Sequence, residues 1–229
     1  MYHDDGYGYG SSGRFGERLT KILIAVIVLV AIGLLASIFD VFSFSTTAFS
    51  EIDDGTYANH EYQNEYFGMK IEVPAEWRVL DKGTIEEIVD EGAQLLTGDS
   101  KAKVSTKQSR HLLVATERPI IYSARTAPVF ECVVSRIPGC YTPEDYLSAM
   151  RKQFEGSQID VSFPGEIGTK SIGGKEFKSL HLVIENGALQ QKWFTCMIKG
   201  YALGFAITYT RPTQEGEMQE MLSRVRFSQ

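Results

Sequence analysis

Residues 201–209 read YALGFAITY, and this stretch decides the fold because its side chains alternate between two kinds. On an extended chain the large apolar side chains share one face and the small ones share the other: Tyr201, Leu203, Phe205, Ile207 and Tyr209 against Ala202, Gly204, Ala206 and Thr208. A period of two is typical of a β-strand. One face is therefore expected to build a core, and the other to let a helix approach the sheet closely.

Three turn signals divide the sequence around this strand: Gly173-Gly174, Asn186-Gly187 and Lys199-Gly200. Dipeptides of this kind favour tight hairpin turns, because glycine and asparagine adopt positive φ angles at low cost. The segments between the turns keep the period of two. The sequence therefore predicts an antiparallel meander that ends with residues 201–209.

Segments with helical spacing lie before and after the meander. Thr84 and Glu87 form a capping box ahead of apolar residues at helical spacing. Thr142 precedes Pro143, which suits the first position of a second helix. A last helix is expected to carry Met218, Met221, Leu222 and Val225. Short strands are expected at 69–73, 111–117 and 129–137. The predicted fold class is α+β, a layered sandwich in which helices cover an antiparallel sheet.

The N-terminal part contains an apolar run. Residues 22–39 read ILIAVIVLVAIGLLASIF, 18 residues without a charge. Such a run is long enough to cross the hydrocarbon core of a membrane as a helix. Basic residues precede it and acidic residues follow it, with no Lys or Arg from residue 40 until Lys70: Arg14, Arg18 and Lys21 against Asp40, Glu51, Asp53 and Asp54. The positive-inside rule then predicts a cytoplasmic N-terminus and a C-terminal domain outside.

A cleaved signal peptide is the alternative, since Thr46-Thr47-Ala48 offers small residues at a cleavage position. The apolar run exceeds the roughly 7–15 residues of a signal-peptide core, so we favour a retained anchor. The expected organisation is a disordered cytoplasmic tail at 1–20, a transmembrane helix at 21–44, a linker at 45–60 and an extracytoplasmic domain at 61–229.

The composition argues against two classes of function. The net charge is −6 and no long basic run occurs, so nucleic acid is not an expected partner. Cys132, Cys140 and Cys196 lie in no zinc-binding pattern. An odd cysteine count leaves at least one thiol free, and the pairing of the other two stays open.

Residues 66–77 read YFGMKIEVPAEW. This segment resembles the opening of PsbP-like domains, in which an aromatic-glycine pair, a strand, a proline and a tryptophan follow in that order. The turn at 172–175 before the meander and the closing segment at 223–227 agree with the resemblance. It implies a three-layer α-β-α fold and an accessory or partner-binding role, as on bacterial lipoproteins and single-span membrane proteins. Lumenal targeting is missing, so an oxygen-evolution role is not carried over, and no functional residue transfers.

No tight catalytic motif marks this sequence. Nucleophilic catalysis is usually announced by a pattern such as GxSxG, which is absent. His3 belongs to the expected tail and His60 to the expected linker, which leaves His111 and His181 for the domain. His181 alternates with leucines and is more typical of a half-buried structural residue than of a base.

Acidic pairs and glycines have structural explanations as well. Glu86-Glu87 opens a helix, where carboxylates favour the dipole, and Asp53-Asp54 lies in the linker. Residues 165–174 lack the lysine-serine ending of a phosphate-binding loop. From the sequence we assign no catalytic residue, no cofactor site and no metal ligand.

Three hypotheses remain from the sequence. The first is a membrane-anchored accessory or binding domain, with membrane lipid around its helix and an envelope protein or peptide as its partner. The second is an envelope enzyme whose site assembles around His111, His181 or Cys196. The third is a purely structural envelope protein.

Overall fold

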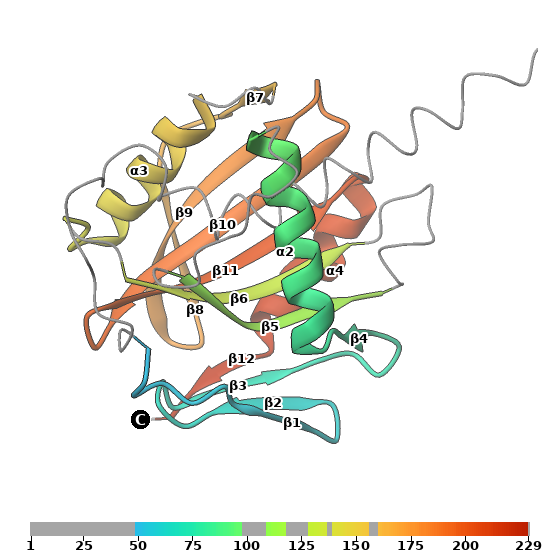
Figure 1. The fold of residues 1–229 in the computed structure, drawn as a ribbon, viewed down its shortest axis with the longest axis vertical. Coiled ribbons are helices and arrows are strands. Elements are labelled where there is room, and N and C mark those ends of the chain that lie inside the picture. The colour runs from blue at the N-terminus through green and yellow to red at the C-terminus, as the bar shows by residue number, and fades with distance from the viewer. Residues whose placement is uncertain (1–48, 98–108, 118–127, 137–138, 156–159, 229) are drawn as a thin grey trace, which may run out of the picture.

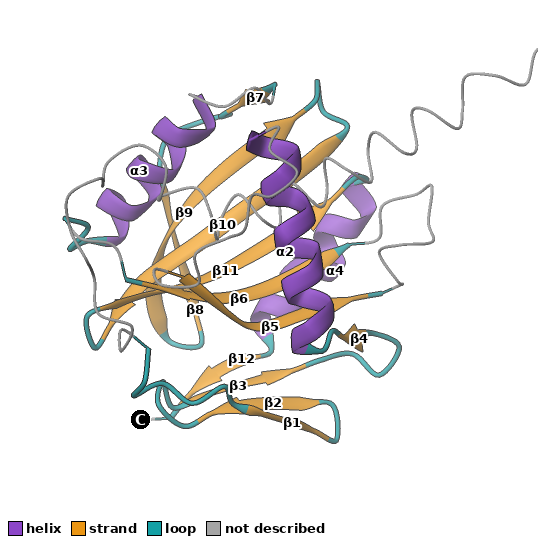
Figure 2. Ribbon diagram, viewed as in Figure 1, coloured by secondary structure: helices purple, strands orange, loops and turns teal. Residues whose placement is uncertain are grey.

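The computed structural model describes residues 49–97, 109–117, 128–136, 139–155 and 160–228. Figures 1 and 2 show a molecule built mainly of sheet, with few helices packed against it. The elements in chain order are β1 (Thr56–Ala58), β2 (Glu61–Asn64), β3 (Met69–Glu72), β4 (Arg78–Val79), α2 (Lys82–Thr97), β5 (Ser109–Thr116), β6 (Val129–Ser135), α3 (Pro143–Glu155), β7 (Val161–Ser162), β8 (Gly168–Ile172), β9 (Lys175–Ile184), β10 (Leu189–Ile198), β11 (Tyr201–Tyr209), α4 (Pro212–Ser223) and β12 (Val225–Phe227).

The larger sheet contains the predicted meander. Its strand order is β4-β5-β6-β11-β10-β9-β7, with β8 paired to β9, and its pairings are antiparallel. The three predicted turns connect β8 to β9, β9 to β10 and β10 to β11, and their residues have positive φ angles: Gly173, Gly174, Asn186, Gly187, Lys199 and Gly200. The meander prediction is therefore confirmed.

The central strand β11 is buried along its whole length, and its two faces join different cores. Leu203, Phe205 and Ile207 belong to one core, while Ala202 and Ala206 belong to the other. The alternation of large and small side chains thus separates the two sides of the sheet as the sequence predicts.

The two faces are covered by different elements. On the small-residue face, α3 packs its buried stripe with Ile88 of α2, the stripe being Tyr146, Leu147, Met150 and Phe154. On the large-residue face, α4 packs together with a second, four-stranded sheet of order β1-β2-β3-β12. Because a sheet shares this second face, the predicted helix-covered sandwich is not confirmed. The described residues form a mostly antiparallel fold with few helices.

The folded part begins earlier than the expected boundary at residue 61. Ile52 is only 4% exposed, and residues 56–58 form β1, which pairs with β2. The carboxylate of Asp53 accepts hydrogen bonds from the backbone N–H groups of Gly55 and Tyr66, at 2.8 and 3.0 Å. The expected linker at 45–60 is corrected accordingly: it contains the buried side chain of Ile52 and the strand β1. Its mostly polar composition gave no sign of either.

The predicted tail at 1–20 and the whole of the predicted anchor at 21–44 belong to the N-terminal 48 residues, which lie outside the described part of the chain. Within the described part, no helix has the length and apolar character needed to cross a membrane.

Two predicted helix ends are wrong. The first helix begins before Thr84: Asp81 accepts the Thr84 N–H at 3.0 Å and its hydroxyl at 2.8 Å, so Asp81 is the cap. The last helix ends at Ser223, and Val225 instead opens strand β12, where it pairs with Ile71 of β3. An apolar residue at helical spacing also suits a strand, so the spacing alone misplaces Val225.

Candidate functional site

The enzyme hypothesis names three alternative centres for a site, His111, His181 or Cys196, and these residues lie apart. His111 lies on the small-residue face of the larger sheet, opposite Val133 of β6. His181 and Cys196 lie on the large-residue face, four register positions apart on neighbouring strands. The structure therefore does not join them in one site.

His111 forms a buried pair with Glu131. Its Nε2 atom lies 3.3 Å from Oε2 of Glu131, and their side chains are 5% and 0% exposed. Burial raises the pKa of the Glu131 carboxyl, and the contact with His111 acts against that rise. Both carboxylate oxygens lack a well-aligned hydrogen-bond donor within the described residues. The pair is the most deeply buried ionisable contact that the described part of the chain contains.

A β-bulge brings this pair together. The register of β5 against β6 shifts between His111 and Leu113, so Leu112 is the extra residue. Strict alternation would place His111 on the face of Leu113, which belongs to the large-residue core. The bulge turns His111 to the opposite face, on which Glu131 also lies. Glu131 itself interrupts the apolar strand β6, and that interruption was the one signal in the sequence that pointed to it.

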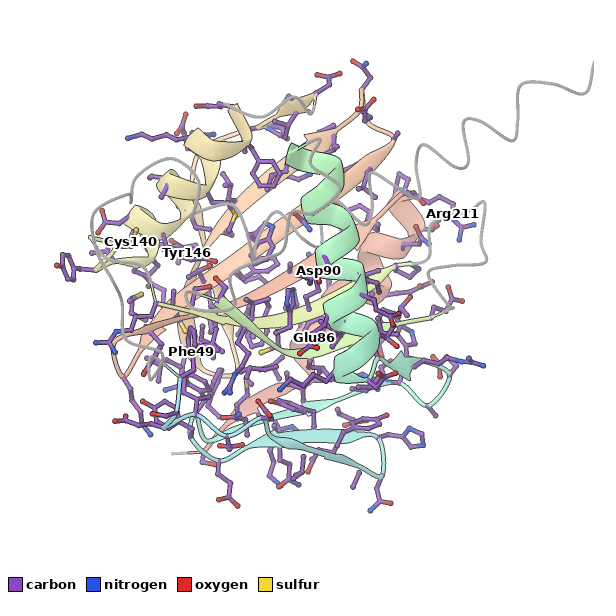
Figure 3. All side chains as sticks on the ribbon, in the orientation of Figure 1. Phe49, Glu86, Asp90, Cys140, Tyr146 and Arg211 are labelled. Atoms are coloured by element: carbon purple, nitrogen blue, oxygen red, sulfur yellow. The ribbon has the colours of Figure 1, made fainter. Side chains whose placement is uncertain are left out.

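A chain of hydroxyl groups lies on the same face. The Ser109 and Ser135 hydroxyls are 2.8 Å apart, and Ser135 lies 3.2 Å from the Tyr146 hydroxyl on α3. Burial raises the pKa of Tyr146 to about 12, so this phenol keeps its proton at neutral pH. Tyr146 and the partly exposed Cys140 are labelled on this side of the molecule in Figure 3. These contacts fix α3 against β5 and β6.

His181 belongs to a half-buried polar cluster beside α4. Its Nε2 atom lies 3.1 Å from the Gln190 side-chain oxygen, and the Tyr209 hydroxyl donates to Glu215 at 3.0 Å. Lys192 forms an ion pair with Glu215. Burial and the nearby Lys192 lower the pKa of His181, so this imidazole is neutral at pH 7. The predicted half-buried position of His181 is confirmed. The contacts of Tyr209 and Lys192 with Glu215 join α4 to the sheet.

The cysteines are free thiols in this structure. Strand β11 separates Cys132 on β6 from Cys196 on β10. Two strand spacings amount to about 10 Å, whereas a disulfide needs Cα atoms closer than about 7 Å. Burial raises the pKa of Cys196 to about 12, which suppresses its reactive thiolate form.

An open hollow lies beside α4 and has a volume of about 240 Å³. We name it the α4 hollow; its lining residues are Pro74, Glu76, Trp77, Glu117, Glu217, Glu220, Met221 and Arg224. Trp77 and Met221 are buried and give it an apolar floor. The segment between β3 and β4 forms one wall, and the last turns of α4 form another.

The rim of the α4 hollow is mainly acidic. Arg224 binds Glu220 at 2.8 Å and Glu72 at 3.3 Å, which holds its guanidinium at one side and raises its pKa. Glu76 and Glu217 are exposed, and neither forms an ion pair with another described residue. The hollow therefore combines an apolar floor with carboxylates that are open to solvent. Sequence reasoning missed it, because its walls come from segments about 140 residues apart.

Among the described residues, no group of three or more His, Cys, Asp or Glu side chains is placed so that it could hold one metal ion.

No protein-family model matches the chain, and no curated protein matches it. Among solved structures, the chain is similar to the solution structure of cyanobacterial PsbP from Synechocystis, with 11% identity and a TM-score of 0.44. That likeness covers 85% of this chain and 99% of the other. The name of the cyanobacterial protein, PsbP, is also the name of the family that residues 66–77 of this chain resemble.

The chain is also similar to the crystal structure of LpqN from Mycobacterium tuberculosis, described as involved in cell envelope biogenesis. The identity is 13% and the TM-score 0.42, with 69% of this chain and 82% of that chain covered. Both likenesses concern the fold and assign no function.

Proposed function

We propose that this chain is a single-pass membrane protein whose folded domain lies outside the cytoplasm and binds an envelope protein or peptide. The apolar run at 22–39, with basic residues before it and acidic residues after it, supports the anchor and its orientation. The observation that carries the binding role is the α4 hollow, an open concavity with an apolar floor.

The chemistry of the α4 hollow favours a basic side chain of the partner. The aliphatic part of a lysine or arginine would lie over Trp77 and Met221, as long charged side chains commonly cover apolar surface. Its charge would meet the solvent-open carboxylates of Glu76 and Glu217. A tryptophan under a cation adds a further attraction of about 0.5–2 kcal/mol.

The test is crosslinking in cells through a photoreactive residue at Ala75, which is exposed between two residues of the hollow. The full-length protein is compared with a version that keeps residues 1–48 and lacks the domain. We expect one envelope protein to be captured repeatedly, through a segment that contains lysine or arginine.

Two double variants that remove the same number of negative charges make this test specific. Glu76→Gln with Glu217→Gln should reduce the capture strongly, whereas Glu86→Gln with Glu87→Gln on α2 should not, because these carboxylates are exposed but lie outside the hollow. Equal capture by both double variants would contradict a role of the hollow. Capture by the anchor alone would contradict a role of the domain.

The second candidate function is an envelope enzyme with a site around His111, His181 or Cys196, and the buried contact of His111 with Glu131 favours His111 as its centre. It would require a turnover that His111→Ala abolishes while the fold is retained.

A further inference from the structure

Lys170 is a half-buried lysine on β8 whose charge is not neutralised by a carboxylate of its own. Its ammonium group donates a hydrogen bond to the side-chain oxygen of Gln219 on α4, and an amide is a neutral partner. The Nζ atom also lies 5.6 Å from the centre of the Phe194 ring. An aromatic ring attracts a cation but adds no net charge. Among the described residues, Lys170 takes part in no ion pair.

A second lysine lies near Lys170 on the same face of the larger sheet. Lys192 on β10 forms an ion pair with Glu215, which precedes Gln219 by one turn of α4. Figure 1 shows α4 behind the sheet, on the face opposite to α2. Helix α4 therefore offers one carboxylate and one neutral amide to two lysines.

The charges that act on Lys170 do not cancel. Burial and the positive charge of Lys192 lower the pKa of Lys170, and the carboxylate of Glu215 acts against them. Within the described part of the chain, Glu215 is the one carboxylate that acts on Lys170 in this way. Two lysines thus face a single carboxylate, and His181 beside them is neutral at pH 7. This part of the face has one positive charge in excess.

Other carboxylates in the neighbourhood belong to different surfaces. Glu144 and Glu176 bind Lys178 at 3.2 and 3.1 Å. Lys178 lies on the opposite face of β9, together with Leu180 of the small-residue core. Glu217 lines the α4 hollow, on the other flank of α4. These carboxylates therefore do not neutralise Lys170.

The strand register adds a hydroxyl group to the same face. Ser179 of β9 pairs with Gly168 of β8, which lies two residues before Lys170. A Cβ atom at position 168 would lie 2.9 Å from the Ser179 hydroxyl oxygen. Because Gly168 has no side chain, β8 leaves that hydroxyl uncovered. We name Lys170, Ser179, Lys192 and Gln219 the Lys170 site.

The side chains of the Lys170 site are suited to donate hydrogen bonds to an oxyanion. An ammonium group has three donors and a hydroxyl group has one. The oxygen of Gln219 accepts from Lys170, which leaves the two N–H donors of its amide for a ligand. Hydrogen bonds from an ammonium group to a charged oxygen are about twice as strong as those between neutral groups. The excess positive charge favours an anion over a cation.

We propose that the Lys170 site binds the carboxylate or phosphate group of a small anionic ligand. The ligand would supply the negative charge that Gln219 does not provide. This inference goes beyond the proposed function, because it involves neither the membrane anchor nor the α4 hollow.

The test is a titration of the full chain, held in nanodiscs of phosphatidylcholine, with acetate and with inorganic phosphate. The amide signals of Gly168 and Ser179 report on the site, and Gly187 in the β9–β10 turn is the distant reference. We expect at least one probe to shift the first two signals to saturation, while sodium chloride at equal ionic strength does not. The probe that saturates at the lower concentration shows whether the site prefers carboxylate or phosphate. No saturable shift with either probe would overturn the proposal.

A matched pair of lysine variants makes the titration specific. Lys170→Gln should weaken binding about tenfold or more, because a hydrogen bond to a charged group is lost. Lys178→Gln removes the same charge from the opposite face of the sheet and should leave the affinity nearly unchanged. Lys170→Arg keeps the charge and should keep most of the binding. Equal weakening in Lys170→Gln and Lys178→Gln would overturn the proposal.

A third variant supplies the missing charge from within the protein. Gln219→Glu places a carboxylate beside Lys170, so it should abolish binding of both probes without lowering the midpoint of thermal unfolding. Lys170→Gln should not lower that midpoint either, because it removes a charge that no carboxylate balances. Wild-type affinity in Gln219→Glu, or a large loss of thermal stability in Lys170→Gln, would contradict a ligand-binding role of the lysine.

These outcomes are separate from those of the proposed function. A chain that does not enter the nanodiscs contradicts the anchor, and its titration is then carried out in solution. Glu76→Gln with Glu217→Gln tests partner capture and should leave the anion titration unchanged, since both residues line the α4 hollow.

Discussion

Glu131 has a fully buried carboxyl group, and the His111 imidazole lies 3.3 Å from it. Removing one member of a buried pair leaves the other without compensation, which typically costs 3–5 kcal/mol. We therefore expect His111→Ala to lower the free energy of unfolding at pH 7 by about 3 kcal/mol. Chemical unfolding of the full chain, followed by the fluorescence of Trp77 and Trp193, measures this, because both rings are buried.

The pH dependence of this variant follows from the raised pKa of Glu131. A carboxyl whose folded pKa exceeds its unfolded value stabilises the fold fully below the unfolded pKa, and this contribution is lost as the pH rises through the folded pKa. Without His111 the pKa of Glu131 rises further. The loss of unfolding free energy in His111→Ala should therefore be larger at pH 7 than at pH 5. In a Glu131→Gln background, the loss of unfolding free energy caused by His111→Ala should no longer increase with pH. An increase in that background would mean that a group other than Glu131 causes the pH dependence.

At the scale of an element, the turn between β8 and β9 tests how the C-terminal strand is held. Gly173 and Gly174 have φ angles of +56° and +79°. A methyl group on Gly173 would lie 2.8 Å from the Phe227 ring and 2.9 Å from the Val225 carbonyl, whereas one on Gly174 would meet nothing within 4 Å. We expect Gly174→Ala to cost about 1 kcal/mol from backbone strain alone, and Gly173→Ala about 3 kcal/mol from strain and overpacking.

Equal losses of unfolding free energy in the two glycine variants would mean that β12 shifts away from the added methyl group without losing stability. Thermal unfolding compares them directly, and hydrogen exchange at Arg226 reports whether β12 still pairs with β3.

The cap of α2 gives a second element-scale prediction. Asp81 receives two hydrogen bonds from Thr84, which lower the pKa of its carboxyl. Asp81→Ala should lower the free energy of unfolding, and Thr84→Ala should lower it less, because the backbone donor remains. The contribution of Asp81 is present above its ordinary pKa of 3.8 and is lost as the pH falls through the lowered one. Thermal unfolding of both variants at several pH values checks the order; a larger loss in Thr84→Ala would restore Thr84 as the cap.

Helices and strands whose apolar side chains repeat with a clear period could be predicted from the sequence. Contacts between side chains of different elements could not. The alternation in residues 201–209 predicts both faces of β11, because two-residue periodicity is a local property. The contact between His111 and Glu131 depends on the extra residue Leu112, which no local pattern reveals. The α4 hollow depends on the docking of α4 beside Trp77, far away in the sequence.

At the scale of the whole molecule, the orientation of the domain across the membrane follows in our proposal from the charges flanking residues 22–39. The structure supplies a reporter position for it, since Tyr141 is 82% exposed at the start of α3. Tyr141→Cys in a Cys140→Ser background places one accessible thiol on the surface, because Cys132 and Cys196 are buried. A membrane-impermeant maleimide should label this variant in intact cells as fully as in lysed cells, while the background without the new cysteine stays unlabelled. Labelling that appears only after lysis would place the domain in the cytoplasm, and the proposed partner outside the cell would then have to be reassigned.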